Sequence, residues 1–258
     1  MAGTDPASWS TSALIEAAYR EQHELDDDSP CPATVALHER GSREVLDAAL
    51  TLCTSLDSKW RSLGARLLGE LGSPERTFPE ECCDELVRLL RDPSQSVVIS
   101  AIYALGHLGN HRRDAELLAL QDHPDPAIRK GVAFALSGTS LPEAVPILLK
   151  LMEDPDVEAR DWATTTLGQA PGFDSPEIRA ALLARATEDD DEIVRGEALH
   201  GLALRGDRRC RPLLAVELEQ PGDHAHLFAD GAKLCLGIEE SEEVAVHDLL
   251  AGLRADRH

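Results

Sequence analysis

Aromatic side chains are scarce in this chain. Phe, Trp and Tyr together make up 3% of the 258 residues, whereas apolar residues as a whole make up 43%. A core must therefore be built mainly from Ala, Leu and Val, which suits thin layers of helices better than a deep globular centre. A chain of this length can bury a sizeable core, either as one large domain or as one repeat array.

Long hydrophobic runs are also missing. No stretch approaches the roughly 20 uncharged apolar residues of a membrane span, so we expect no membrane partner. The opening sequence MAGTDPASWSTSALIEAAYREQ carries Asp5 and Glu16, and it lacks both a basic leader and an apolar run. It is therefore not expected to be a secretion signal, and the expected location is cytoplasmic.

Metal and redox motifs are absent as well. The chain has neither a CxxC pair nor zinc-type cysteine spacing, so its cysteines are expected to be small buried thiols in a reducing compartment. The six cysteines are Cys31, Cys53, Cys82, Cys83, Cys210 and Cys235. The close histidine pairs are His224-x-His226 and His107-x3-His111, which we interpret as surface or capping residues. We expect no metal and no cofactor.

Catalytic motifs are missing too. We find no GxxxxGK[ST], no GxGxxG after a strand, no GxSxG and no HExxH. No pair of nucleophile and base can be proposed from spacing, so no catalytic residue is predicted and the chain is expected not to be an enzyme.

Positive charge is in short supply. There are 25 Lys and Arg against 47 Asp and Glu, which gives a formal net charge of −22. Such a field repels phosphate backbones and attracts basic surfaces, so we expect a basic protein partner and no nucleic acid. The alternative is that the acid only keeps the protein soluble, with Asp26 to Asp28 and Glu188 to Glu192 as solvated loops.

What the chain does have is an internal repeat. An apolar residue recurs every 31 to 37 residues, a small or β-branched residue follows it by four positions, and a leucine follows by eight. Offsets of 0, 4 and 8 lie on one face of an α-helix, so each copy predicts a core stripe. The stripes are Trp60, Gly64, Leu68; Val97, Ala101, Leu105; Ile128, Val132, Leu136; Ala159, Ala163, Leu167; Val194, Ala198, Leu202; and Phe228, Ala232, Leu236.

Charged residues recur beside the stripe. An acid lies five residues before the stripe at Asp92, Asp154, Asp189 and Asp223, where it is expected to accept backbone hydrogen bonds at a helix start. An arginine follows the first stripe residue at Arg61, Arg129, Arg160 and Arg195, whereas Val98 and Ala229 break this series. A second apolar helix precedes each turn, so the unit is helix, turn and helix. Such a unit cannot bury its apolar face alone, and neighbouring units must stack.

The pattern resembles HEAT repeats, particularly the short bacterial form also found in phycobilin lyases. The phrase DPxxxVRxxAxxALGxLG is approached by DPSQSVVISAIYALGHLG at residues 92–109 and by DPDVEARDWATTTLG at residues 154–168. The resemblance covers about residues 42 to 237. It implies an all-α, right-handed α-solenoid of about six HEAT-like hairpins. It also implies that Asp154, Arg160, Asp189 and Arg195 belong to a ladder of hydrogen bonds between adjacent repeats and are structural.

The two ends differ from the repeats, as capping requires. Residues 1–41 are expected to form an N-terminal helical cap, with a helix over 12–24, and to include a charged, proline-containing break. Residues 42–240 are expected to form the repeat array. Residues 241–258 are expected to form a C-terminal capping helix, with Val244, Val246, Leu249, Leu250 and Leu253 covering the last repeat.

Several HEAT-like families are enzymes, but their chemistry needs residues that this chain lacks. Deoxyhypusine hydroxylases hold two irons with four His-Glu pairs, whereas only His23-Glu24 and His38-Glu39 occur here. HEAT-like DNA glycosylases need a cationic face for the duplex, which the charge balance disfavours, although Trp162 beside Asp161 is superficially suggestive. We interpret Trp162 instead as packing between repeats.

A solenoid of this kind presents its second helices as a concave wall, and positions two and six after the stripe should project from it. Tyr103 and Phe134 share one offset in adjacent repeats, and Ile99 lies one turn before Tyr103, so the three could form one patch. The alternative is a wider stripe whose rings fill gaps between repeats. The predicted partner-binding residues are Ile99, Tyr103, Lys130, Phe134, Asp161, Thr165 and His200.

These observations favour a non-enzymatic scaffold or adaptor that binds another protein on the concave face of the solenoid. A special case is an inhibitor of a basic partner. The alternative is a HEAT-like lyase or chaperone that handles a small molecule such as a tetrapyrrole. The sequence does not predict an oligomeric state.

Overall fold

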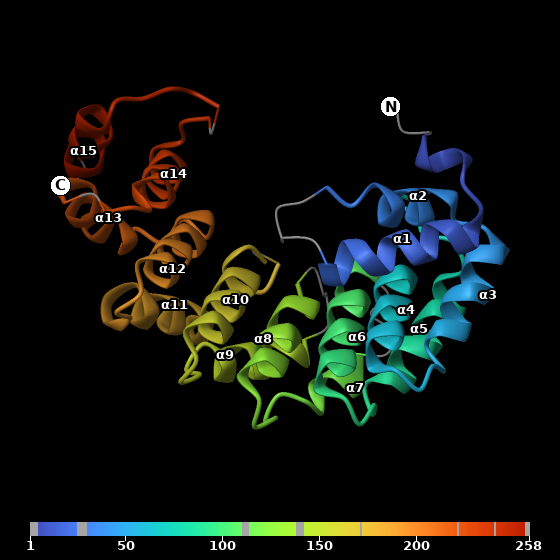
Figure 1. Ribbon diagram of the computed structural model, residues 1–258. Helices are drawn as coiled ribbons and strands as arrows, with labels where there is room; N and C mark the ends of the chain where they lie inside the picture. Colours follow the sequence, from blue (N-terminus) through green and yellow to red (C-terminus); the bar gives the residue numbers. More distant parts are fainter. Residues whose placement is uncertain are drawn as a thin grey trace. The chain divides into compact units, whose positions relative to one another are not determined.

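In a computed structural model of the protein, the part of the chain that can be described consists of helices and connecting turns, without a strand (Figure 1). The described residues are 5–24, 30–109, 114–137, 142–170, 172–220, 222–239 and 241–255. The chain divides into two compact units, Met1–Asp122 and His123–His258, which we describe in turn.

The first unit contains two helical hairpins beneath a pair of terminal helices. In the hairpins α3 packs against α4 and α5 against α6, while α4 also lies along α6. The second helices of consecutive repeats therefore stack on each other. The elements are η1 (Pro6–Ser8), α1 (Thr11–Glu24), α2 (Pro32–Arg40), α3 (Arg43–Leu52), α4 (Ser58–Glu70), α5 (Pro79–Leu89), α6 (Gln95–Leu108) and α7 (Asp114–Leu118).

The second unit continues the same arrangement. The second helices α8, α10, α12 and α14 pack on one another in chain order, and α9, α11 and α13 pack beside α10, α12 and α14. The final helix contacts both α13 and α14. The elements are α8 (Pro126–Ala135), α9 (Ala144–Leu151), α10 (Val157–Gly168), α11 (Pro176–Glu188), α12 (Glu192–Leu204), α13 (Cys210–Glu219), α14 (Ala225–Leu236) and α15 (Val246–Ala255).

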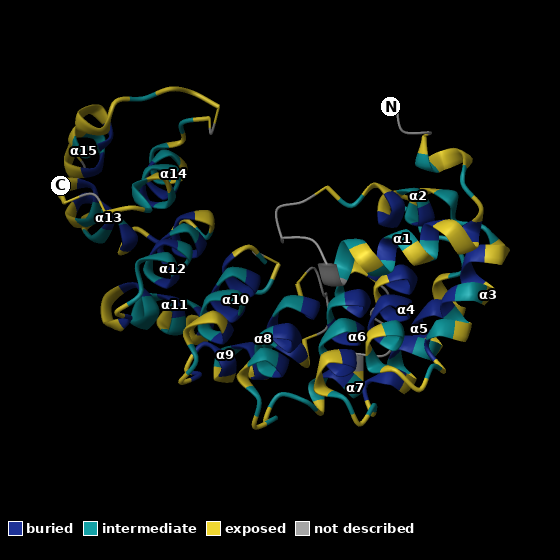
Figure 2. Cartoon of the chain, in the orientation of Figure 1, coloured by how far each residue is buried: buried dark blue, intermediate teal, exposed yellow. Residues whose placement is uncertain are grey.

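The predicted stripes form the core between successive helices. Sixteen of the 18 stripe residues are buried, and Trp60 and Leu236 are half-buried. Trp60 stacks on Tyr19 of α1, with ring centroids 4.0 Å apart. Figure 2 shows the buried residues on the helix faces that meet within each unit. The repetition in the sequence thus predicts the packing of the second helices correctly.

Small residues allow the closest approaches between helices. A Cβ added at Gly201 of α12 would lie 2.7 Å from the Cα of Gly168 in α10. A Cβ added at Gly64 of α4 would lie 2.7 Å from the Sγ of Cys53. Both distances are shorter than van der Waals contact, so a larger side chain would push these helices apart.

An arginine–aspartate ladder joins consecutive repeats within each unit, as the family resemblance implies. Arg61 binds Asp92 at 2.8 Å, Arg129 binds Asp154 at 2.6 Å, and Arg160 binds Asp189 at 2.8 Å. In each pair Nε and Nη2 of the arginine donate to both carboxylate oxygens. Bidentate pairing of this kind fixes geometry as well as adding energy.

The same arginines also tie down the turn of their own repeat. Nη1 of Arg160 donates to the backbone oxygens of Asp154 and Pro155, and Arg61, Arg129 and Arg195 make the equivalent pairs of bonds. Although burial opposes ionisation, the hydrogen bonds from the arginines lower the pKa of Asp92, Asp154 and Asp189.

Two details of the ladder differ from the sequence prediction. The acids that cap the helices lie three residues before the stripe, not five. Their carboxylates accept hydrogen bonds from backbone amides in the first turn of the helix. These caps are Asp57 for α4, Asp125 for α8, Asp156 for α10 and Asp191 for α12. The acids five residues before the stripe accept backbone bonds in the turn instead. In addition, Arg195 pairs with Glu217 of α13 at 2.8 Å and not with Asp223.

One rung is missing from the sequence. Where the series requires an arginine and an aspartate, the chain has Val98 and His123. The division between the two compact units falls at His123. The sequence therefore lacks both members of the arginine–aspartate pair at these two positions.

The chain ends are more helical than predicted. The expected helix over 12–24 is α1, with Leu14 and Ala18 buried, but the helix α2 that follows was not predicted. Part of the acidic break, residues 25–29, lies outside the described residues. At the other end α15 buries Leu249 and Leu253, whereas Val246 is exposed, so fewer residues cover α14 than expected. The division at 41 and 240 stays a prediction.

Candidate partner-binding surface

The seven predicted partner-binding residues are all half-buried on second helices. At the same two offsets, Ser62 and Gly196 are buried, whereas Arg66 and Leu234 are exposed. The packing stripe is therefore wider than the three positions that define it. Each predicted residue keeps only part of its side chain available for a partner.

In the first unit, Ile99 and Tyr103 of α6 line the same cavity of about 280 Å³. Arg66 and Glu70 of α4 and His38 of α2 line it as well. Burial lowers the pKa of His38, although Glu70 opposes this effect. His38 lies on the unpredicted helix, and only its place in a His-Glu pair drew attention to it in the sequence.

In the second unit, Phe134 of α8 packs edge-on against Trp162 of α10. Their ring centroids are 4.9 Å apart and the ring planes make an angle of 89°. The prediction that Trp162 packs between repeats is confirmed, and Phe134 shares this role. Phe134 and Tyr103 belong to different compact units, so their combination in one patch stays a prediction.

Asp161 of α10 carries a charge that its surroundings do not balance. Its Oδ1 is buried without a hydrogen-bond partner among the described residues. Burial, and after it the nearby carboxylates of Glu197, Asp191 and Glu158, raise the pKa of Asp161 to about 6, against the effect of Lys130. Lys130 lies 2.9 Å from Glu158 and is thus shared between acids. The sequence indicated the position of Asp161 but not this imbalance.

Thr165 and His200 contribute less distinctive chemistry. Thr165 lies one turn after Asp161 on α10, between the buried residues Thr164 and Thr166. The backbone of His200 passes close to Gly231 of α14, 3.8 Å from a Cβ added there. Asp161, Lys130, Phe134 and Thr165 thus occupy two adjacent helices, α8 and α10, which pack on each other, and His200 lies on α12.

Comparisons with known proteins agree with this architecture. A family model described as HEAT repeats matches residues 115–203. Residues 115–203 therefore carry HEAT repeats. Protein YibA of Escherichia coli K12 is 25% identical over 197 residues, which cover 71% of this chain and 67% of YibA.

Solved structures extend the HEAT-repeat fold over nearly the whole chain. The crystal structure of Escherichia coli YibA aligns with a TM-score of 0.69 and 20% identity, covering 97% of this chain and 94% of YibA. A HEAT-like repeat protein from Thermococcus onnurineus NA1 aligns with a TM-score of 0.55 and 15% identity, covering 95% and 98%. The CpcE–CpcF complex of phycocyanin lyase from Nostoc sp. PCC7120 aligns with a TM-score of 0.52 and 17% identity, covering 98% of this chain and 97% of the matched chain. These likenesses establish the α-solenoid fold.

The described residues contain no group of three or more His, Cys, Asp or Glu that could hold a metal ion. The rings of His224 and His226 are 6.1 Å apart, and His224 faces Glu192 at 3.5 Å. His111 and the side chain of His23 lie outside the described residues. Among the described helices, none has the length and apolar character needed to cross a membrane.

Replacing Asp161 by asparagine is expected to stabilise the protein at neutral pH. The pKa of about 6 lies above the unfolded value of about 3.9, so the folded state binds the proton more tightly. The ionised Asp161 therefore lowers the free energy of unfolding. This effect is absent below about pH 3.9 and complete above about pH 6. Because the side chain is partly exposed, we discount the gain to about 1 kcal/mol.

Urea unfolding of wild type and Asp161→Asn at pH 8 and pH 4 measures this gain. The matched control is Asp230→Asn, at the same offset on α14, where Lys233 lies 3.7 Å away. The control should gain no stability at pH 8. A gain for Asp161→Asn that is as large at pH 4 as at pH 8 would contradict the electrostatic explanation.

Proposed function

We propose that this protein is a non-enzymatic binding scaffold whose second-helix surface holds another protein with a basic face. The observation that carries the proposal is the uncompensated carboxylate of Asp161 beside Glu158 and Glu197. A Lys or Arg side chain from a partner would supply the missing hydrogen-bond donor and positive charge. A charged pair formed in a partly desolvated site is worth more than one on the open surface.

The rest of the surface fits this role. Phe134 and Trp162 provide aromatic area next to Asp161, and Lys130 and Glu158 lie at its edge. An aromatic centre with a charged rim has the composition of an interface anchor. Stacked repeats hold these groups in place before binding, so the ordering cost on binding is small. The net charge of −22 would draw a basic partner toward the surface.

An inhibitor of a basic protein is the special case we favour. A polyanionic surface can occupy a basic site whose normal ligand is itself a polyanion. In this case the scaffold would bind the active face of its partner and compete with that ligand. Location in the cytoplasm stays part of the proposal.

Binding of a basic probe should depend strongly on salt and on Asp161. The probe is a fluorescent Lys- and Arg-rich peptide, followed by anisotropy, with a neutral Gly- and Ser-rich peptide of equal length as the control. We expect Kd to rise about tenfold or more from low to physiological salt. Asp161→Asn should weaken binding by about tenfold, although it stabilises the free protein. The matched variant Asp230→Asn should bind like the wild type.

This pairing separates function from folding, because a variant that is more stable yet binds less well cannot be explained by damage to the fold. Salt-indifferent binding, or equal affinity of both variants, would contradict the role of Asp161. Tyr103→Ala and Phe134→Ala test the aromatic residues one unit at a time. If both fold and keep wild-type affinity for a partner protein, the aromatic assignment is wrong.

The second candidate function is the handling of a small molecule by a HEAT-like lyase or chaperone. The specific observation in its favour is a cavity of about 560 Å³ near the C-terminal end of the second unit, large enough for a small organic ligand. A native mass spectrum and an absorbance scan of purified protein would reveal a bound ligand or chromophore. A ligand-free, colourless preparation favours the scaffold.

A further inference from the structure

Two thiols that are distant in the sequence meet in the second unit. Cys210 begins α13, and Cys235 lies near the end of α14, 25 residues later. Their sulfur atoms are 3.0 Å apart, and both cysteines are free thiols. At this distance the sulfurs share a hydrogen bond, and a movement of about 1 Å would bring them to the length of a disulfide.

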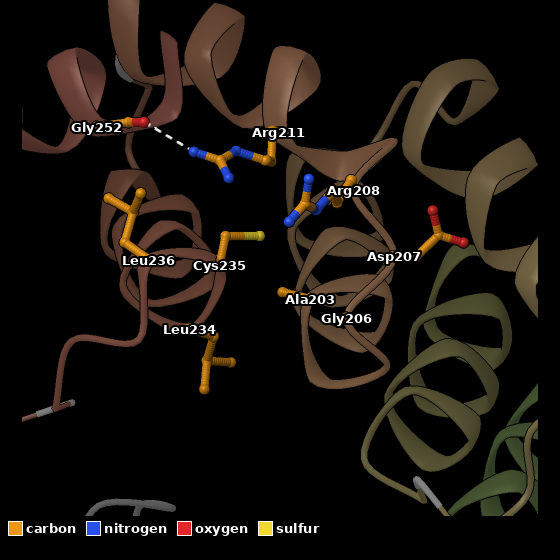
Figure 3. A pocket seen from close by; sticks show the side chains of 9 residues that line it. All are labelled: Ala203, Gly206, Asp207, Arg208, Arg211, Leu234, Cys235, Leu236 and Gly252. Atoms are coloured by element: carbon orange, nitrogen blue, oxygen red, sulfur yellow. Dashed lines mark hydrogen bonds between the residues drawn. The ribbon is translucent and has the colours of Figure 1, made fainter. Parts of the chain in front are cut away.

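The two thiols differ in their access to solvent. Cys210 is buried, whereas Cys235 is half-buried and lines the cavity of about 560 Å³ (Figure 3). In Figure 3 the sulfur of Cys235 points toward the side of the cavity that carries Arg208 and Arg211. A small reagent that enters the cavity therefore reaches Cys235 first. The residues that line the cavity are Ala203, Gly206, Asp207, Arg208, Arg211, Leu234, Cys235, Leu236 and Gly252.

The surroundings of Cys235 favour its thiolate. The guanidinium of Arg211 is held by a 2.8 Å hydrogen bond to the backbone oxygen of Gly252 in α15. The side chain of Arg208 makes no hydrogen bond or ion pair with the described part of the chain, and it adds a second positive charge to the cavity. Cationic neighbours and a donated hydrogen bond are the features that activate cysteines in proteins.

The direction of the pKa shifts agrees with this geometry. The hydrogen bond from Cys210 lowers the pKa of Cys235, burial opposes the shift, and Arg211 assists it. The same hydrogen bond and burial raise the pKa of Cys210. By contrast, burial raises the pKa of Cys53 and of Cys82 to about 12, so those thiols are expected to be inert.

We propose that Cys235 is a reactive thiol that hydroperoxides oxidise, and that Cys210 resolves the product into a disulfide. The Cys235 thiolate attacks one oxygen of hydrogen peroxide, the O–O bond breaks, and the leaving hydroxide takes a proton to form water. Cys235 is then a sulfenic acid. The sulfur of Cys210 attacks the sulfur of Cys235, a second water leaves, and the S–S bond forms. In total, two thiols and one peroxide give one disulfide and two waters.

The modification site uses none of the residues proposed to bind a partner. The disulfide would join α13 to α14 next to their contact with α15. It would constrain the unfolded chain and so stabilise the oxidised protein, and added thiols would reverse it.

The test treats the intact protein with hydrogen peroxide and maps disulfides by mass spectrometry of unreduced peptides. We expect the mass to fall by two hydrogen atoms and a single cross-link to join Cys210 to Cys235. The melting temperature should rise and return to its starting value with dithiothreitol. Cys235→Ser should abolish the cross-link, and Cys210→Ser should leave a sulfenic acid on Cys235 that dimedone traps.

The matched controls are Cys53→Ser and Cys82→Ser, which should retain the cross-link. In Cys210→Ser, dimedone should label Cys235 at least about tenfold faster than Cys53 or Cys82. Equal labelling of these cysteines, a cross-link between other cysteines, or none in the wild type would overturn the proposal. Mapping in the wild type decides the matter even if a variant fails to fold.

Discussion

Asp189→Ala is expected to lower the free energy of unfolding by about 3–5 kcal/mol, because it removes one partner of a buried ion pair. The Asp189 side chain is only 1% exposed. It accepts from Arg160 at 2.8 and 3.0 Å, from Arg185 at 3.1 Å and from the backbone amide of Asp191 at 3.2 Å. Alanine would leave these donors without their acceptor in a place that water reaches poorly.

Chemical unfolding measures the loss, and hydrogen exchange locates it. Each repeat contacts mainly its neighbours, so exchange should rise in α10, α11 and α12 and stay unchanged in α4 and α6. The control is Glu81→Ala, which breaks the pair with Arg43, where both side chains are about half exposed. We expect no measurable loss there, as for most surface pairs. Equal effects of the two substitutions would show that the ladder does not hold the repeats together.

The ladder also determines the response to acid. The pKa values of Asp92, Asp154 and Asp189 are lowered in the folded protein. Their ionised carboxylates therefore contribute fully to the free energy of unfolding above the unfolded pKa of about 3.9. It is lost as the pH falls through the lower folded values. Asp189→Ala should therefore lose less stability than the wild type between pH 5 and pH 2, which acid titration by circular dichroism would measure.

Leu167→Ala is expected to cost about 2–5 kcal/mol, because it opens a cavity in the core between packed helices. Leu167 is fully buried on α10, which packs against both α8 and α12. Thermal and urea unfolding give the change in stability.

The matched control for this substitution is Leu236→Ala, at the same offset in the last repeat. Leu236 is half-buried, and its neighbour Gly252 on α15 covers only part of it. The loss there should stay below about 2 kcal/mol. If Leu236→Ala lowered the free energy of unfolding as much as Leu167→Ala, the stabilisation by these leucines would not depend on how deeply each one is buried.

The helices and their core faces were largely predictable because the repeat is periodic. Six copies of one stripe allow an exception at a single position to be recognised. Of the 18 residues predicted to lie in the core, 16 are buried. The arginines and aspartates of the ladder followed from the family resemblance. The non-repeated ends lacked this redundancy, so α2 was missed and the cover on the last repeat was overestimated.

The candidate site was only partly predictable. Offsets of two and six along a helix identify residues beside the stripe, but they do not say how far a neighbouring helix covers them. Phe134 meets Trp162 only because α8 and α10 cross where they do. The imbalance at Asp161 depends on Glu197, which comes from another helix.

The sequence by itself determined the helical hairpins, their apolar stripes and the strongly acidic character, because these depend on local periodicity and composition. Only the tertiary structure decided which side chains meet across helices. The contact of Cys210 with Cys235 arises from helices brought together by stacking. So does the burial of Oδ1 of Asp161, which has no hydrogen-bond partner among the described residues. Distances of this kind depend on the exact crossing of neighbouring helices, and no spacing within one helix encodes them.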